Sequence, residues 1–217
     1  MIEIKKLSKK IGRTIVLDDI DLTIPNATIV GLQGINGSGK TMLIRSIAGL
    51  IKPTKGSVSI NGKTLWKDIS FPPSIGALIE NPAFLGSYTG FDNLEMLASL
   101  KHKIGKREIQ AAISRVGLNP DDKRKYKKYS LGMKQRLGIA AAIMEKPDIV
   151  LLDEPTNALD EEGVQTLKDI ITDQKKRGAI VVVASHDRLF LESVAEIIYR
   201  FENGRLVGSR KQEVIQQ

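Results

Sequence analysis

The segment from Gly34 to Thr41 constrains the fold of this chain more than any other. It reads Gly-Ile-Asn-Gly-Ser-Gly-Lys-Thr, so two glycines stand five positions apart and Lys and Thr follow. This spacing is typical of a phosphate-binding loop, because glycines let successive backbone N–H groups turn inward around an anion. An apolar run at 28–33 and helical spacing over 41–50 predict a strand before the loop and a helix after it. The positive end of that helix would face the same phosphates.

Individual roles follow from the chemistry of the side chains in this loop. Lys40 would reach the β- and γ-phosphates of a nucleotide, and Thr41 would give a hydroxyl ligand to Mg²⁺. The alternative is a glycine-rich turn that precedes a lysine by chance. Such a turn would not need a strand before it and a helix after it, so these two flanking elements favour the phosphate loop. The nucleotide-binding residues that this segment predicts are Gly34, Asn36, Gly37, Ser38, Gly39, Lys40 and Thr41.

The remaining hydrophobic pattern predicts an α/β fold. Apolar runs at 149–152 and 179–184, separated by a helical pattern, indicate a parallel sheet. Residues 16–24 alternate apolar and polar, as half-buried antiparallel strands do. We expect one domain over 1–217 with a P-loop NTPase (RecA-like) parallel-sheet core, an N-terminal antiparallel β layer, and an inserted helical subdomain at about 83–145.

Two acidic residues and one histidine follow the predicted core strands directly. Asp153 and Glu154 come after the apolar run 149–152, and His186 comes soon after the run 179–184. In open α/β sheets ligands bind at the carboxyl ends of the strands. Asp153 would therefore hold Mg²⁺, Glu154 would orient or deprotonate an attacking water, and His186 would contact the γ-phosphate. An acidic helix cap before Pro155 is the structural alternative for the two carboxylates.

Composition bounds the possible classes of protein. The chain has 217 residues, 41% of them hydrophobic, and no cysteine, which suits one domain with a substantial core and excludes disulfides and thiolate metal sites. No secretory signal is visible in residues 1–10, and the apolar runs fall far short of the roughly 20 residues that span a bilayer. The formal net charge is +8. Nucleic acid or an anionic membrane would attract such a chain, but we interpret the charge as a lysine-rich solvated surface.

Further motifs identify a family. Residues 129–137 read Tyr-Ser-Leu-Gly-Met-Lys-Gln-Arg-Leu, and 157–160 read Asn-Ala-Leu-Asp. These two segments resemble the signature and the D-loop of ABC transporter ATP-binding subunits. The loop at 34–41 resembles the P-loop of the same family, the acidic pair its Walker B motif, and His186 its H-loop. The resemblance covers essentially the whole chain.

This resemblance implies an ATPase that hydrolyses ATP with Mg²⁺ and works as a homodimer or heterodimer. Two ATP molecules would lie between the P-loop of one subunit and the signature of the other, where Ser130 and Gly132 would contact the γ-phosphate, with Asp160 nearby. The ATPase would drive a separate integral-membrane permease from the cytoplasmic face of the membrane, and no nucleic acid partner is expected.

Three departures from the common family pattern change these expectations. Leu131 and Met133 replace the usual Gly and Gln of the signature, although Ser130 and Gly132 remain. Ile11 stands where many relatives place an aromatic residue that stacks on adenine, so we expect weak recognition of the base.

Glu80 is the third departure, because it occupies the expected position of the Q-loop glutamine. We expect Glu80 to join the Mg²⁺ shell directly or through water. The segments at 77–82 and 88–94 resemble the bacitracin and lantibiotic export or immunity branch of the family, which implies a peptide antibiotic as the transported substrate.

A different class of function is an ABC ATPase that acts on nucleic acid or ribosomes. DNA-repair relatives insert a long coiled coil between P-loop and signature, whereas Lys40 and Ser130 are only 90 positions apart here (130 − 40). Translation-associated relatives carry two ATPase units in one chain, and this chain has one set of motifs. Both features favour the transporter ATPase.

Overall fold

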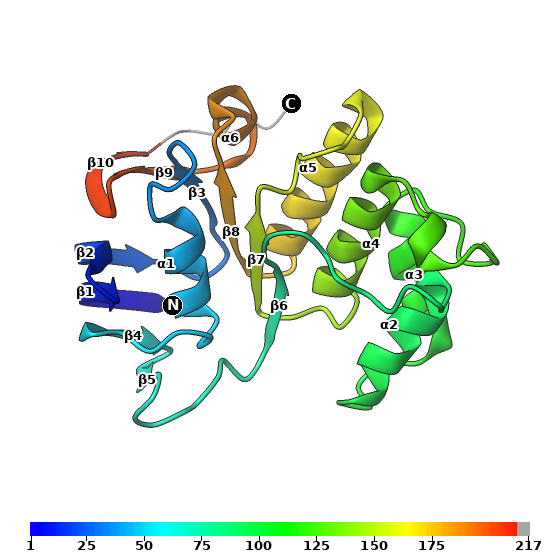
Figure 1. The fold of residues 1–217 in the computed structure, drawn as a ribbon, viewed down its shortest axis with the longest axis horizontal. Coiled ribbons are helices and arrows are strands. Elements are labelled where there is room, and N and C mark those ends of the chain that lie inside the picture. The colour runs from blue at the N-terminus through cyan, green and yellow to red at the C-terminus, as the bar shows by residue number, and fades with distance from the viewer. Residues whose placement is uncertain (212–217) are drawn as a thin grey trace.

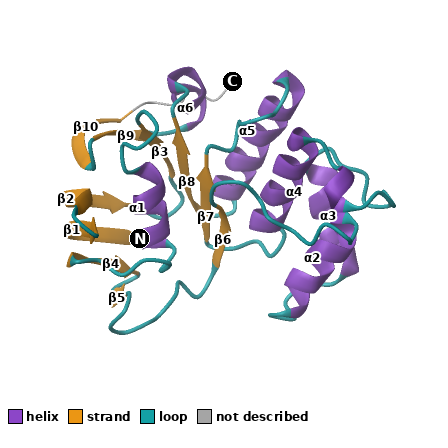
Figure 2. Cartoon of the chain, viewed as in Figure 1, coloured by secondary structure: helices purple, strands orange, loops and turns teal. Residues whose placement is uncertain are grey.

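Two β-sheets and the helices around them form the chain in this computed structural model, which describes residues 1–211 (Figures 1 and 2). One sheet has the order β2-β1-β4-β5 and the other has the order β10-β9-β3-β8-β7-β6. The strands are β1 (Ile2–Ile11), β2 (Thr14–Ile24), β3 (Ile29–Gln33), β4 (Lys55–Ile60), β5 (Lys63–Thr64), β6 (Ile75–Leu78), β7 (Ile149–Asp153), β8 (Ile180–Ser185), β9 (Ile197–Glu202) and β10 (Arg205–Lys211).

The smaller sheet is antiparallel and confirms the expected N-terminal β layer. β1 pairs antiparallel with both β2 and β4. Alternation explains its one buried face, because Leu17, Ile20, Leu22 and Ile24 of β2 are buried while most residues between them are more exposed.

The larger sheet has a parallel core, as the apolar runs predicted. β3 pairs parallel with β8 and β9, and β8 pairs parallel with β7, which pairs parallel with β6. All residues of β7 and β8 are buried, as expected for strands covered on both faces. Register aligns their ends, since Gln33 lies opposite Ser185 and Asp153 lies opposite Ala184. The strands therefore deliver their last residues to one edge.

Helices cover both faces of this sheet (Figure 1). Helix α1 lies between the two sheets, and its apolar side joins a core cluster with the N-terminal strands. A second core cluster joins the opposite face of the sheet to the remaining helices. The helices are α1 (Lys40–Ile47), α2 (Gly90–Ser99), α3 (Lys106–Arg115), the 3₁₀ turn η1 (Tyr126–Lys128), α4 (Leu131–Ile143), α5 (Glu161–Lys176) and α6 (Arg188–Val194).

Between β6 and β7 the chain forms α2, α3, η1 and α4, which are joined by turns and loops. No helix within 1–211 has both the length and the apolar character to cross a membrane. The pattern of residues 75–80, which ends in a turn at Asn81-Pro82, predicts a strand over 75–80. The observed strand is shorter, because β6 ends at Leu78. Glu80 has φ +57°, a left-handed conformation that does not continue a strand.

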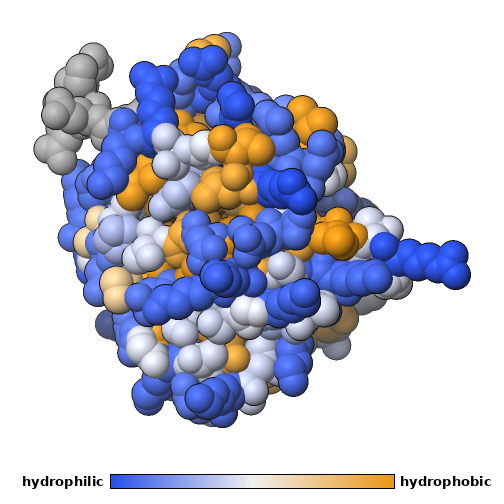
Figure 3. All heavy atoms as spheres, turned by 90° about the vertical axis from the view of Figure 1, so that its left-hand side faces the viewer, coloured by the Kyte–Doolittle hydropathy of each residue, from blue (hydrophilic) through white to orange (hydrophobic). Residues whose placement is uncertain are grey.

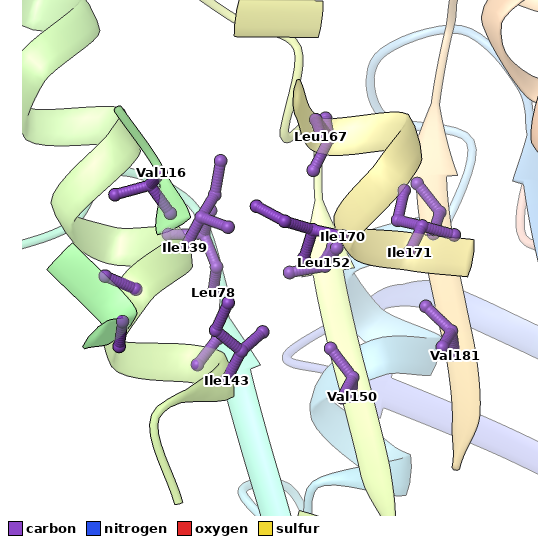
Figure 4. Packing of buried hydrophobic residues seen from close by; sticks show 14 of the residues in the cluster. Leu78, Val116, Ile139, Ile143, Val150, Leu152, Leu167, Ile170, Ile171 and Val181 are labelled. Atoms are coloured by element: carbon purple, nitrogen blue, oxygen red, sulfur yellow. The ribbon is translucent and has the colours of Figure 1, made fainter. Parts of the chain in front are cut away.

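Helix α4 packs against β6 so closely that the two backbones approach each other at Gly76. Ile139 and Ile143 of α4 face Leu78 of β6 (Figure 4). A Cβ atom at Gly76 would lie 1.7 Å from the carbonyl oxygen of Ala142. Only glycine therefore allows α4 to approach the sheet this closely.

We predict that Gly76→Ala lowers the free energy of unfolding by about 3 kcal/mol, because the added methyl group must push α4 away from β6. Gly208→Ala is the matched control, since a Cβ there meets nothing within 4 Å. Urea denaturation measures both variants. Equal midpoints for the two would contradict the close packing.

Candidate functional site

The loop between β3 and α1 has the backbone that a phosphate loop needs. Gly37 and Gly39 adopt φ +81° and +109°, which side chains strongly disfavour. A Cβ at Gly39 would also lie 3.1 Å from the carbonyl oxygen of Val16. Gly39 precedes α1, and no side chain of the described residues caps that helix. Its first N–H groups are thus available to an anion, while Asn36 is exposed in the loop.

The Lys40 ammonium is folded back onto its own loop. Its Nζ donates to the carbonyl oxygens of Gly34 at 2.6 Å and Ile35 at 3.2 Å. The same Nζ lies 3.3 Å from Glu154 Oε1, an ion pair that lacks hydrogen-bond geometry. Because the side chain is 5% exposed, this cation is largely withdrawn from water and held by groups that a phosphate could replace.

Thr41 and Asp153 meet at the end of β7. Thr41 Oγ1 donates to Asp153 Oδ2 at 2.8 Å, whereas Asp153 Oδ1 is buried without a hydrogen-bond partner among residues 1–211. Burial raises the pKa of Asp153, and the neighbouring Glu154 charge adds to the shift. A hydroxyl beside a buried, partly unsatisfied carboxylate is an oxygen set that fits Mg²⁺. Ser38 Oγ is likewise buried without a partner.

Glu154 and His186 lie together, as the sequence predicted from their strand ends. His186 Nδ1 is 2.8 Å from Glu154 Oε2. An ionised carboxylate only accepts hydrogen bonds, so this contact requires Nδ1 to carry the hydrogen. Glu154 therefore lies between an imidazole and the Lys40 ammonium.

Glu80 has its backbone near the predicted metal ligands and its side chain elsewhere. The backbone N–H of Glu80 favours the ionised form of Asp153 and so partly opposes the raised pKa. The Glu80 carboxylate, 59% exposed, accepts from Arg45 Nη2 at 2.7 Å. Arg45 belongs to α1, so this ion pair connects the segment after β6 to the helix that follows the phosphate loop.

The signature and D-loop residues form a separate group in this subunit. Ser130 is the N-cap of α4 and accepts from the backbone N–H of Met133. A Cβ at Gly132 would lie 2.7 Å from the carbonyl oxygen of Ala158. Asp160 is the N-cap of α5, and its hydrogen bond from the Gly163 backbone lowers its pKa. These residues line an open hollow of about 720 Å³.

The structure thus brings together Lys40, Thr41, Asp153, Glu154 and His186. The hydrogen bonds that Ser130 and Asp160 make within the described part of the chain do not include the phosphate loop, and the hollow lined by Ser130, Gly132 and Asp160 has no lining residue from that loop. Ile11, the last residue of β1, is 49% exposed. Figure 3 looks onto the side of the molecule that carries the N-terminal sheet, where apolar atoms are interspersed in a hydrophilic surface.

Sequence reasoning did not anticipate three contacts around this site. Arg45 pairs with Glu80, Arg136 pairs with Asp160, and Gln135 bonds to the backbone beside Glu154. Arg45, Gln135 and Arg136 each lie within a helix. The local sequence pattern of a helix does not distinguish a polar residue that makes a tertiary contact from one that faces solvent.

Comparisons with known proteins agree with these motifs. The family model described as ABC transporter matches residues 17–157. The uncharacterized ABC transporter ATP-binding protein YybJ of Bacillus subtilis is 52% identical over 211 residues, which are 97% of each chain. The bacitracin transport ATP-binding protein BcrA of Enterococcus faecalis is 37% identical and covers 95% of this chain and 68% of its own. The lantibiotic transport ATP-binding protein SrtF of Streptococcus pyogenes is 34% identical, covering 95% and 89% respectively.

Solved structures show the same fold. A structure described as the ATP binding subunit of an ABC transporter has a TM-score of 0.87 at 26% identity, covering 97% of this chain and 90% of its own. The dimeric post-hydrolysis state of the ATP-binding cassette MJ0796, bound to ADP and Pi, has a TM-score of 0.85 at 25% identity, covering 97% and 98%. The chain therefore belongs to the ABC transporter family and is an ATP-binding and ATP-hydrolysing subunit.

Proposed function

We propose that this chain is the motor of a peptide-antibiotic export or immunity transporter, and that it drives a separate integral-membrane permease from the cytoplasmic face of the membrane. The names of BcrA and SrtF, which refer to bacitracin and lantibiotic transport, support this substrate class. The observation that carries the ATPase chemistry is the convergence of Lys40, Thr41, Asp153 and Glu154 at one edge of the sheet.

ATP binding in this proposal begins with an exchange of partners at Lys40. The ammonium leaves the carbonyl oxygens of Gly34 and Ile35 and pairs with the β- and γ-phosphates, whose greater charge outcompetes a neutral carbonyl. The backbone N–H groups of the loop and the N-terminus of α1 bind the same phosphates. Thr41 and Asp153 hold Mg²⁺, which supplies positive charge that neutralises the phosphates.

Glu154 is proposed to orient the attacking water. When Lys40 turns to the phosphates, Glu154 Oε1 loses its cation and becomes the acceptor for a water hydrogen. His186 keeps the other oxygen in place through Nδ1–H. In this arrangement His186 Nε2 donates to the γ-phosphate only if the ring carries both hydrogens. Catalysis is then mainly positioning and charge stabilisation.

The hollow beside Ser130 and Gly132 is proposed to receive the γ-phosphate of a second ATPase subunit. Ser130 begins α4, so the positive end of a helix opens toward that hollow. The separation of this hollow from the phosphate loop within one subunit supports a head-to-tail dimer, and the MJ0796 cassette, which is described as dimeric, supports the association of two such subunits.

We predict that Glu154→Gln lowers kcat by about 10²- to 10⁴-fold, because the water loses its base, and that the variant forms a dimer in ATP but not in ADP. Size-exclusion chromatography with light scattering measures the mass. Adding Ser130→Arg, at an exposed position, should return the protein to a monomer. A monomer for Glu154→Gln in saturating Mg²⁺-ATP would exclude pairing with a second copy of this chain.

The Glu80 carboxylate is proposed to exchange Arg45 for the Mg²⁺ shell when nucleotide binds. The Glu80 backbone N–H lies near Asp153 and favours its ionised form, so in this proposal the side chain leaves Arg45 and turns toward the metal. A carboxylate can only accept hydrogen bonds and would repel the γ-phosphate unless a cation lies between them.

We predict that Glu80→Gln raises the Mg²⁺ concentration for half-maximal ATPase activity by about fivefold, the equivalent of losing roughly 1 kcal/mol of interaction. Glu95→Gln is the control, since Glu95 is an exposed carboxylate that pairs with Lys106 away from the site. Steady-state ATPase assays over a Mg²⁺ titration check the shift. If Glu80→Gln and the control give the same curve as the parent, Glu80 has no role at the metal.

A further inference from the structure

Gln135 is a buried polar side chain that points from the signature helix into the backbone of the catalytic segment. It lies in α4, is 6% exposed, and its Nε2 donates to the carbonyl oxygens of Glu154 at 3.2 Å and Pro155 at 3.1 Å. Both N–H bonds of the amide are therefore used across tertiary structure. Packing alone would not require this chemistry, because an apolar side chain of equal length would fill the same volume.

The segment that Gln135 contacts is under backbone strain. Glu154 adopts φ +47°, a left-handed conformation that is uncommon for a residue with a side chain. Pro155 follows directly, and proline restricts the residue before it to extended conformations. Such strain persists only when neighbouring groups hold the backbone in place, and it is concentrated at functional sites.

Two elements hold this strained residue from opposite directions. The Glu154 backbone N–H donates to the carbonyl oxygen of Ala184 in β8 at 2.8 Å. On the other side its carbonyl oxygen accepts from Gln135 and from the backbone N–H of Asn157 at 3.2 Å. Only Gln135 among these donors comes from the helical region, so it is the side-chain bond that connects α4 to this peptide.

We propose that Gln135 is a positioning residue for ATP hydrolysis. It fixes the peptide planes on either side of Pro155, so that the Glu154 carboxylate stays beside His186 and keeps its free oxygen directed at the attacking water after Lys40 has turned to the phosphates. The proposal rests on the proposed role of Glu154 as the residue that orients the attacking water. A shift of about 1 Å in a catalytic group costs on the order of 10²-fold in rate.

The same helix begins at the signature, so Gln135 connects two functions within one subunit. Ser130 caps α4, and Gln135 follows five positions later on the same helix. Arg136 donates to Asp160 at 2.6 Å, and Gly132 approaches Ala158 closely. Helix α4 thus contacts the 154–160 segment at three points. A displacement of the signature by the nucleotide of a partner subunit would move the backbone of the Glu154 in its own subunit.

The test compares variants that keep the size of Gln135 and change its hydrogen bonding. Gln135→Met keeps the length and the helix propensity of the side chain but removes the donor. Gln135→His restores an N–H at a similar distance from the backbone. Gln165→Met is the matched control, because Gln165 lies on the exposed face of α5 and its side chain donates to Asp169 on the same helix. Steady-state ATPase assays give kcat and KM, and a fluorescent ATP analogue gives the dissociation constant.

We expect Gln135→Met to lower kcat by about 10- to 100-fold while the dissociation constant of the analogue changes by less than about threefold. Gln135→His should recover most of kcat, and Gln165→Met should behave like the parent. In the Glu154→Gln background, Gln135→Met should still give the ATP-dependent dimer.

Several results would overturn the assignment. A parent-like kcat for Gln135→Met, a failure of Gln135→His to recover activity, or an equal loss of kcat and nucleotide affinity would each show that Gln135 does not position Glu154. The proposed function fails separately, because it requires Glu154→Gln to be inactive. If Glu154→Gln is inactive and Gln135→Met hydrolyses like the parent, only the role of Gln135 is wrong.

Discussion

The site depends on three charged groups that are withdrawn from water: Lys40 and Glu154, which form an ion pair, and Asp153, which accepts from Thr41. The side chains of Lys40 and Glu154 are 5% and 17% exposed, and Asp153 is almost fully buried. Burying such groups costs free energy unless they are paired or bound to a metal. The raised pKa of Asp153 reflects that cost. The parallel register of β3, β8 and β7 brings these charges together. In the proposed function, Mg²⁺-ATP would replace their mutual contacts with stronger ones.

Two sets of side-chain contacts connect this edge of the sheet to the rest of the subunit. The ion pair between Arg45 and Glu80 joins the segment after β6 to α1. The contacts of Gln135 and Arg136 join α4 to the segment after β7. The backbones of β6 and α4 are also in close contact at Gly76. A shift of the helical region would therefore change at least one of these contacts. A movement of the helical region can therefore reach the candidate nucleotide site through short contacts.

The sequence predicts the phosphate loop and the strand-end residues, because both depend on local spacing. Glycines in the loop between 34 and 39 have a conformational requirement that few other motifs share, and parallel strands necessarily bring His186 and Glu154 to the same edge. The antiparallel layer follows equally from alternation in β2. The turn Asn203-Gly204 indicates that β9 and β10 form an antiparallel hairpin, but this local signal could not predict the parallel pairing of β9 with β3.

Side-chain partners could not be predicted, since they depend on tertiary distances. A glutamine in the middle of α4 has the same local pattern whether it faces water or the carbonyl oxygen of Glu154. The residue at 80 was expected at the end of a strand, but β6 ends at Leu78 and the left-handed turn directs the side chain to Arg45. Whether that carboxylate reaches the metal depends on a rearrangement that the sequence does not encode locally.

The most direct test of the account is the Mg²⁺ dependence of ATP affinity in Asp153→Asn. Calorimetric titration of ATP in Mg²⁺ and in EDTA gives the gain in affinity that the metal provides. The account predicts that the parent binds ATP more tightly in Mg²⁺, and that Asp153→Asn loses this gain but keeps the affinity measured in EDTA, because Lys40 and the loop are unchanged. An equal Mg²⁺-dependent gain in both proteins would contradict the assignment of the β7 carboxylate to the metal.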